Sequence, residues 1–363
     1  MAGKRYFDYP MLFLVIFLIC FGLVMIYSTS SYKSTVTYGN SYHWLLRQAV
    51  AIVLGAVAMV VCCKLDYRII KSEKFGNGCY WASIVLLVLV LIIGAAKKGA
   101  VRWISIAGFQ FQPSEVSKIL VVIYLANRLS ANAHKIRTFK DSIVIVLPTV
   151  PIIALIVTQN LSTALVVCSM IGVMLFVVSP KMKELMLTAG GGIILLFVYL
   201  LTANSYRNER VQIWLHPESH KKGFQTMQAL YAIGSGGIFG KGLGQSMQKM
   251  GFIPESHNDM IFSIICEELG LFGAVCLILV FAALIWRMLL IAMNADELLG
   301  SLLVIGVITH IAMQVFVNIA VVTNTIPPTG IPLPFISYGG SSIFSTMIEM
   351  GIVLSVSRRI HLG

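Results

Sequence analysis

The stretch PMLFLVIFLICFGLVMIYSTS, residues 10–30, decides the fold class of this chain. A charge-free run of this length can cross a bilayer as a helix, because a membrane-spanning helix needs about 20 apolar residues. Lys4 and Arg5 precede the run, as they would in a secretory signal. No small-residue cleavage site follows and further apolar runs come after it, so we interpret residues 10–30 as a retained first span.

Nine more apolar runs follow, which gives ten predicted spans. They cover residues 44–63, 79–96, 113–128, 142–158, 160–179, 184–203, 259–286, 298–320 and 341–357. Hydrophobic residues make up 58% of the chain and charged residues only 12%, whereas soluble domains contain about 25% charged residues. This composition excludes a soluble enzyme and a disordered chain. It predicts one all-α polytopic membrane domain, residues 1–363, with a long outer loop at about 204–258.

The charge distribution predicts the topology. The 27 Lys and Arg residues against 15 Asp and Glu residues give a formal net charge of +12. No soluble module carries a basic patch, so we exclude nucleic acid and attribute the excess to topology and to contact with membrane lipid. Fifteen of the 27 lie in inner segments if the N-terminus is cytoplasmic, which predicts two cytoplasmic termini. Arg102, beside Trp103, lies on the outer side, where it either snorkels or faces an anionic substrate.

Ionisable side chains inside predicted spans are costly in lipid, so they indicate function by default. Glu115 and Lys118 share a helix face, either as a pair that only neutralises itself or as a functional pair. Asp259 and Glu267 would lie about 80° apart around one helix, so we expect both to line one cavity. Glu268, on the opposite side of the helix from Asp259, is expected to point elsewhere.

Two stretches rich in glycine or proline interrupt the apolar pattern. Residues 234–244, GSGGIFGKGLG, fail both the Walker and the dinucleotide-binding spacing. They indicate either tight turns with close backbone packing or backbone N–H groups that face an anion. Residues 327–342, PPTGIPLPFISYGGSS, cannot form a regular helix. Irregular backbone at membrane depth is tolerated beside a cavity or within protein, so this stretch is predicted to shape a pocket.

Four stretches together resemble the SEDS family of FtsW, RodA and SpoVE proteins. They are Arg102-Trp103 with FQPSEVSK at 111–118, YAIGSGG at 231–237, PESHND at 254–259 with EELG at 267–270, and TGIPLPFISYGGS at 329–341. The resemblance covers nearly the whole chain, and GKGLGQSMQK at 240–249 is more similar to FtsW and SpoVE than to RodA. Asn160 stands where the family often has an acidic residue, which leaves the role of a charge there open. We assign no role to Glu349.

The resemblance implies a ten-span peptidoglycan glycosyltransferase that polymerises lipid II at the outer face of the bacterial plasma membrane. It implies as partners a class B penicillin-binding protein and other divisome proteins, in septum synthesis during division or sporulation. The family's catalytic aspartate matches Asp259. Its other functional positions match Arg102, Trp103, Glu115, Lys118, Glu267 and Ser337.

In such a reaction a sugar C4 hydroxyl attacks an anomeric carbon and undecaprenyl diphosphate leaves. We expect Asp259 to act as the general base. The leaving diphosphate needs cations, which Arg102, Lys118, Arg210 or a divalent Mg²⁺ or Mn²⁺ ion would supply. The candidate ligands of such an ion are Glu115, Asp259 and Glu267, and no motif indicates an organic cofactor. A lipid II flippase and a non-catalytic scaffold that recruits a transpeptidase remain alternatives.

Overall fold

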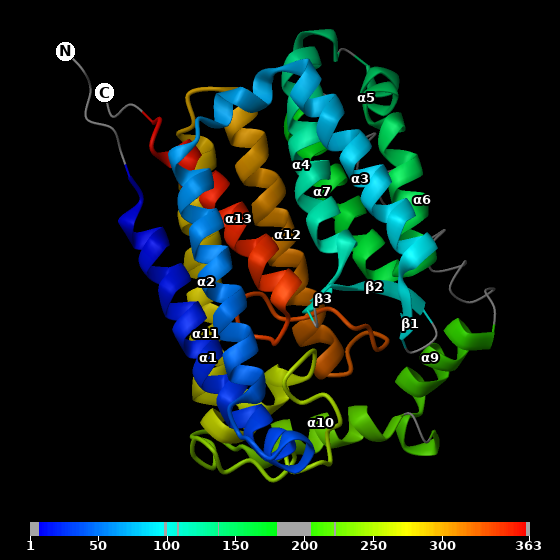
Figure 1. The fold of residues 1–363 in the computed structure, drawn as a ribbon, viewed down its shortest axis with the longest axis vertical. Coiled ribbons are helices and arrows are strands. Elements are labelled where there is room, and N and C mark those ends of the chain that lie inside the picture. Colours follow the sequence, from blue (N-terminus) through cyan, green and yellow to red (C-terminus); the bar gives the residue numbers. More distant parts are fainter. Residues whose placement is uncertain are drawn as a thin grey trace.

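The computed structural model describes residues 7–97, 100–106, 109–136, 138–179, 205–220 and 223–360. Over these ranges the chain forms a bundle of long helices with a small sheet at one end (Figure 1). Its long unbroken or nearly unbroken helices are α1 (Tyr9–Tyr38), α2 (His43–Lys64), α3 (Glu73–Ile93), α4 (Pro113–Asn132), α7 (Leu161–Val178), α11 (Ile261–Met293), α12 (Leu298–Val322) and α13 (Gly340–Ser357).

Shorter elements complete the described chain. They are the helices α5 (Phe139–Val146), α6 (Val150–Gln159), α9 (Ser205–Leu215) and α10 (Phe224–Ser235), with the 3₁₀ turns η1 (Tyr67–Lys71), η2 (Ala133–Lys135), η3 (Leu147–Thr149) and η4 (Pro217–Ser219). Pro148 and Pro151 lie where α5 gives way to η3 and α6, because proline cannot continue the helical hydrogen-bond ladder. The fifth predicted span is therefore a helix with a break in its middle.

Nine of the ten predicted spans coincide with described helices, and the seventh, residues 184–203, lies outside the described residues. Within the described part, eight segments are long and apolar enough to cross a membrane. The chain is therefore a multi-pass membrane protein. The fourth predicted span, α4, falls short of that apolarity, and most of its side chains are buried by neighbouring helices.

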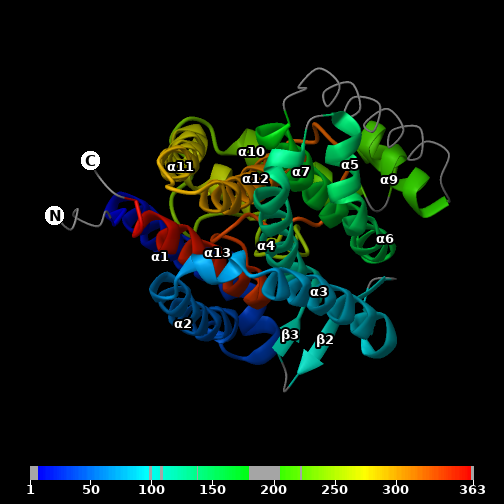
Figure 2. The ribbon, with the colours of Figure 1, turned by 90° about the horizontal axis from the view of Figure 1, so that it is seen from above.

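The helices α12 and α13 form the centre of the bundle (Figure 2). In the most apolar 18-residue stretch of each helix, the share buried inside the protein is 67% for α12 and 72% for α13. The corresponding share for α2 is 22%. A helix that is apolar on all sides can be enclosed by other helices, while one with an exposed apolar face must meet lipid. The polar side chains of α12 and α13 are thus the ones most shielded from lipid.

A three-stranded antiparallel sheet interrupts the helical pattern, which the sequence did not lead us to expect. Its strands are β1 (Ala95–Lys97), β2 (Ala100–Ile106) and β3 (Phe109–Phe111), in the order β1-β2-β3. Ala95 pairs with Trp103, and Ile104 pairs with Phe111. The Ser341 hydroxyl, at the start of α13, accepts from Gln112 N and donates to Gln110 O, both at 3.0 Å. The sheet is thereby fixed to the central helix.

Both ends of the described chain meet at the end of the bundle opposite the sheet (Figure 1). The Asp8 carboxylate caps α1 by accepting from Met11 N, and it pairs with Arg287 of α11 at 2.7 Å. The Asp8 N–H also donates to the Ser357 hydroxyl near the end of α13. This arrangement agrees with an even number of spans.

Candidate functional site

Asp259 lies in a turn-rich segment at the sheet end of the bundle, two residues before α11 begins at Ile261. Its main-chain carbonyl accepts a hydrogen bond of 2.7 Å from Asn318 Nδ2 on α12. The same amide nitrogen donates to Ile331 O at 2.8 Å. A Cβ added to Gly330 would lie 3.9 Å from Asp259 Oδ2, so the carboxylate lies beside this glycine.

The two residues before Asp259 are held by Ser337 and Tyr338. The Ser337 hydroxyl donates to Asn258 O at 2.7 Å and accepts from Leu333 N at 2.8 Å. Tyr338 N donates to the carbonyl of His257 at 2.9 Å. Three successive carbonyls, at positions 257–259, are therefore fixed by hydrogen bonds, and such anchoring limits the positions that the Asp259 carboxylate can adopt.

The segment from residue 323 to residue 339 contains neither helix nor strand, which confirms the prediction for residues 327–339. The last three residues of the predicted irregular stretch, 340–342, already belong to α13. Phe335 adopts φ 63°, a conformation that is uncommon outside glycine. Arg210 Nη1 on α9 donates to Pro328 O at 3.2 Å, and Trp214 Nε1 donates to Asn324 O at 3.0 Å. Residues 323–339 thus contain Ser337, lie beside Asp259 and accept a hydrogen bond from Arg210.

His257, Trp44 and Tyr338 pack their rings together beside this segment. The Trp44 ring centre lies 5.2 Å from that of His257 and 4.9 Å from that of Tyr338. Burial, with a smaller contribution from the Lys33 ammonium, lowers the pKa of His257 to about 4. His257 is therefore neutral near pH 7, and burial raises the pKa of Tyr338, so its phenol keeps its proton.

The expected helical relation between Asp259 and Glu267 is wrong, because α11 starts only after Asp259. The Glu267 carboxylate is fully buried and accepts from Lys241 Nζ at 2.7 Å. It also accepts from the Ser246 hydroxyl and from Met247 N. Glu267 therefore binds the loop at residues 241–248, and this loop occupies its carboxylate.

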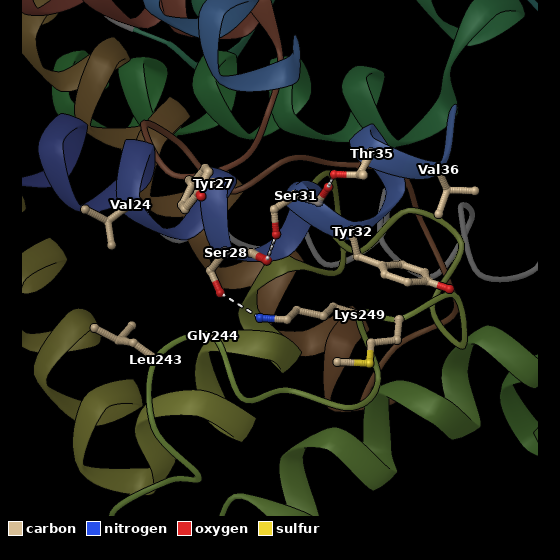
Figure 3. A pocket seen from close by; sticks show the side chains of 11 residues that line it. Val24, Tyr27, Ser28, Ser31, Tyr32, Thr35, Val36, Leu243, Gly244 and Lys249 are labelled. Carbon is tan, nitrogen blue, oxygen red and sulfur yellow. Dashed lines mark hydrogen bonds between the residues drawn. The ribbon is translucent and has the colours of Figure 1, made fainter. Parts of the chain in front are cut away.

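Glu268, which was expected only to point elsewhere, makes several polar contacts. Its carboxylate accepts from the Ser28 hydroxyl of α1 at 2.7 Å and pairs with Lys249 Nζ at 2.8 Å, with no exposed side-chain surface. Lys249 Nζ also donates to Ser28 Oγ (Figure 3). Two adjacent glutamates on α11 thus hold both ends of the 241–249 loop.

The glycine-rich stretch packs against a break in α11. Gly270 has φ 69°, which interrupts the helix. Four backbone hydrogen bonds join the two segments: Lys241 N to Glu267 O (3.0 Å), Gly242 N to Glu268 O (2.9 Å), Leu271 N to Gly237 O (2.9 Å) and Phe272 N to Ile238 O (3.0 Å). A Cβ on Gly240 would collide with the Glu268 carbonyl. The close-packing alternative is therefore correct for Lys241 and Gly242, whose N–H groups are occupied by protein.

A cavity of about 550 Å³ lies between the C-terminal part of α1 and the 243–250 loop (Figure 3). Ser28 and Lys249 line it together with apolar and aromatic side chains such as Tyr27 and Leu243. None of the site residues predicted from the sequence is among the residues that line it.

Glu115 and Lys118 form a buried ion pair on α4. Lys118 Nζ lies 2.9 Å from Glu115 Oε1, and the two side chains are only 1% and 5% exposed, for lysine and glutamate respectively. Arg102 Nε on β2 donates to Gln159 O, at the end of α6, at 2.6 Å, and Trp103 is half-buried next to it. The structure therefore joins Asp259, Ser337 and Arg210 through one segment, while Arg102, Glu267 and the α4 pair are bound elsewhere.

Two buried amides that the sequence reasoning missed support this site. Asn318 is described above, and Gln48 of α2 accepts from Gly339 N at 3.1 Å and donates to Ser337 O. Both stand inside predicted membrane spans, where a polar side chain is a signal in its own right. Asn160 caps α7 by accepting from Ser162 N, a bond that an acidic residue at this position could also accept.

The acidic residues do not fit a protein-held divalent ion. A Mg²⁺ or Mn²⁺ site needs several converging oxygen ligands. Glu115 is paired with Lys118, and Glu267 with Lys241. Among the described residues, no group of three or more His, Cys, Asp or Glu side chains is placed to hold a metal. We therefore derive no catalytic step through a metal.

The comparisons with known proteins agree with this architecture. The family described as "Cell cycle protein", FTSW_RODA_SPOVE, matches residues 9–361. The chain belongs to the FtsW, RodA and SpoVE family. A "Probable peptidoglycan glycosyltransferase FtsW" of Geobacter metallireducens is 37% identical over 98% of this chain and 96% of its own length. "Stage V sporulation protein E" of Bacillus subtilis is also 37% identical, over 97% of this chain and 97% of its own length.

The structure of this FtsW, RodA and SpoVE family member is also similar to a solved structure. It is described as "Structural coordination of polymerization and crosslinking by a peptidoglycan synthase complex". Its matching chain has a TM-score of 0.82 and 29% identity, with 98% of this chain and 99% of that chain covered. The all-α polytopic membrane fold expected from the sequence is therefore that of the family.

Proposed function

We propose that this chain is a peptidoglycan glycosyltransferase that polymerises lipid II. The observation that carries the proposal is the anchoring of the main chain at His257, Asn258 and Asp259 to α12 and to the irregular 323–339 segment. Holding a reacting group in place removes part of the entropic barrier to reaction. The names of the FtsW relatives, which describe probable peptidoglycan glycosyltransferases, support the same reaction class.

In the proposed reaction the C4 hydroxyl of an N-acetylglucosamine unit attacks the anomeric carbon of a second lipid-linked chain. The new glycosidic bond forms as the bond to undecaprenyl diphosphate breaks, and Asp259 takes the proton of the hydroxyl. Arg210, bound to the same segment as Asp259, and Arg102 supply positive charge for the departing diphosphate. Lys118 contributes once it is released from Glu115.

The test is lipid II polymerisation by purified Asp259→Asn protein. This substitution keeps the shape of the side chain and removes its basicity, and loss of a general base typically lowers rates by about 10²–10⁴. Glu218→Gln, on the exposed η4 turn, is the control and should polymerise at the wild-type rate. Glycan strands of normal length from Asp259→Asn would reject Asp259 as the base. Translocation without polymer, or neither activity, from the wild type would favour the flippase or the scaffold.

We also propose a class B penicillin-binding protein and other divisome proteins as partners, with both termini on the cytoplasmic side. The matched solved structure is described as a synthase complex that couples polymerisation with crosslinking, which supports a partner that crosslinks. The meeting of Asp8 with Ser357 at one end of the bundle supports termini on one side of the membrane. The positive-inside rule supports the cytoplasmic side.

A further inference from the structure

Another buried pair of ionisable side chains lies in the core, outside the proposed catalytic machinery. His310 of α12 and Glu349 of α13 have no exposed side-chain surface, and His310 Nδ1 lies 2.8 Å from each oxygen of the Glu349 carboxylate. Removing two such groups from water is expensive, and a buried ion pair adds little to stability compared with apolar packing. The pair is therefore a candidate for a role other than stability.

The His310–Glu349 pair is close enough to the Glu115–Lys118 pair to act on it electrostatically. His310, when it carries a charge, acts on the Glu115 carboxylate, and Ser342 is a further polar neighbour of that carboxylate. His310 Nε2 and Glu115 Oε2 are both buried and neither atom has a hydrogen-bond partner. A potential donor and an acceptor, each unused, thus occur in one shielded region of the core, where charges interact more strongly than in water.

The charge count in this region explains why a histidine would be placed here. Glu115 and Glu349 bring two negative charges, and Lys118 brings one positive charge. Protonation of His310 on both ring nitrogens makes the group of four neutral. Lys118 is only 1% exposed, so it can meet an anionic ligand only by leaving Glu115. Glu115 would then be a buried carboxylate without its cation, which is strongly unfavourable unless another cation is near.

We propose that His310, held by Glu349, is a positioning residue that compensates Glu115 when Lys118 turns to the diphosphate of the substrate. The inference rests on the proposed function for the identity of the anion. The ion pair between Lys118 and Glu115 breaks, Lys118 pairs with the diphosphate, and the positive charge that His310 carries when both ring nitrogens hold a proton compensates the Glu115 carboxylate. No proton leaves the four groups in this exchange.

The test measures the affinity of the purified protein in detergent for undecaprenyl diphosphate, with undecaprenol as the uncharged probe. The double variant His310→Gln with Glu349→Gln removes both charges and keeps hydrogen-bonding side chains. We expect it to bind undecaprenyl diphosphate at least tenfold more weakly than wild type and to bind undecaprenol equally well. Asp8→Asn with Arg287→Gln removes another largely buried ion pair at the far end of the bundle and should leave both affinities unchanged.

A mutant cycle separates positioning from a structural role. Lys118→Gln alone should weaken undecaprenyl diphosphate binding, and adding the His310 and Glu349 changes should weaken it less than twofold further, because the exchange can no longer occur. The proposal would be overturned if the affinity losses of Lys118→Gln and of the His310 and Glu349 double variant multiplied in the combined variant. It would also be overturned if the double variant bound undecaprenyl diphosphate as tightly as wild type. If the double amide variant does not fold, His310→Met with Glu349→Leu gives an apolar replacement of the pair, with the same expectations.

Failure of this inference is distinguishable from failure of the proposed function. Wild-type protein that binds undecaprenyl diphosphate but does not polymerise lipid II would reject the function and leave the mutant cycle to decide the role of His310. Wild-type protein that polymerises lipid II while the double variant keeps full diphosphate affinity would reject only the role of His310. Wild-type protein with no affinity for undecaprenyl diphosphate would overturn the exchange itself.

Discussion

Asn318→Leu should separate the anchoring of Asp259 from the stability of the bundle. The wild-type side chain is buried and donates two hydrogen bonds, to Asp259 O at 2.7 Å and to Ile331 O at 2.8 Å. Leucine has a similar size but no donor, so it orphans two carbonyl groups. Each buried group left without a partner costs about 1–3 kcal/mol, which gives about 2–6 kcal/mol for the pair.

The loss of activity should exceed what this loss of stability explains. Freed from Asn318, the Asp259 main chain can shift, and a misplacement of about 1 Å at a reacting group can lower the rate about 10²-fold. We therefore expect Asn318→Leu protein that still elutes as a folded species to polymerise lipid II about 10²-fold more slowly. The assay is the initial rate of glycan formation in detergent, alongside thermal unfolding of the same sample.

Gln314→Leu is the matched control, one helical turn earlier on α12. Gln314 is equally buried, and its Oε1 accepts no hydrogen bond. Replacing it with leucine therefore leaves no donor without the acceptor that Oε1 would have supplied. This variant should keep its polymerisation rate within about twofold of wild type, as expected for a change away from the anchor. Equal rates for Asn318→Leu and wild type would refute the reasoning, since they would mean that Asp259 needs no such support.

Three further predictions follow from the same description. Cysteines introduced at Ser219 and at Thr138 should react with a membrane-impermeant thiol reagent from opposite sides, and labelling from one side would contradict the topology. A complex with the cognate class B penicillin-binding protein should raise polymerisation, and equal rates with and without it would remove that partner from the proposal. The pKa of His257 is about 4 in the folded protein and 6.5 in the unfolded chain. Its contribution to the free energy of unfolding, about 3 kcal/mol, is therefore present above pH 6.5 and is lost as the pH falls towards 4. Over this pH range the unfolding temperature of the wild type should fall more steeply than that of His257→Phe.

Hydropathy predicted the spans well because lipid imposes a length and a composition on each helix. Proline and glycine density predicted the irregular segment that holds Ser337, since these residues exclude a continuous helix. The sheet was missed because β1 and β3 have three residues each, and β3 is held by a hydrogen bond from Ser341 of α13 that no local pattern records. Short strands of this kind are set by tertiary context.

The candidate site was predicted in its residues but not in its connections. Asp259 was placed on a helix because the apolar run begins at residue 259, yet the helix begins at Ile261. The pairing of Glu267 with Lys241 and of Glu268 with Lys249 joins positions 26 and 19 residues apart, which helical periodicity cannot reveal. Asn318 and Gln48 were visible as polar residues in apolar runs, but their partners depend on the irregular loop.

The break in α11 at Gly270 has a consequence for how the protein enters the membrane. A backbone carbonyl left bare in hydrocarbon costs several kcal/mol, so the broken helix is tolerable only once residues 237–242 lie against it. These residues precede α11 in the chain, so the ribosome synthesises residues 237–242 before the helix whose backbone groups they bind. A circular permutant that begins at Ile261 would reverse this order of synthesis and make α11 wait, with exposed polar backbone, for a loop still to be translated.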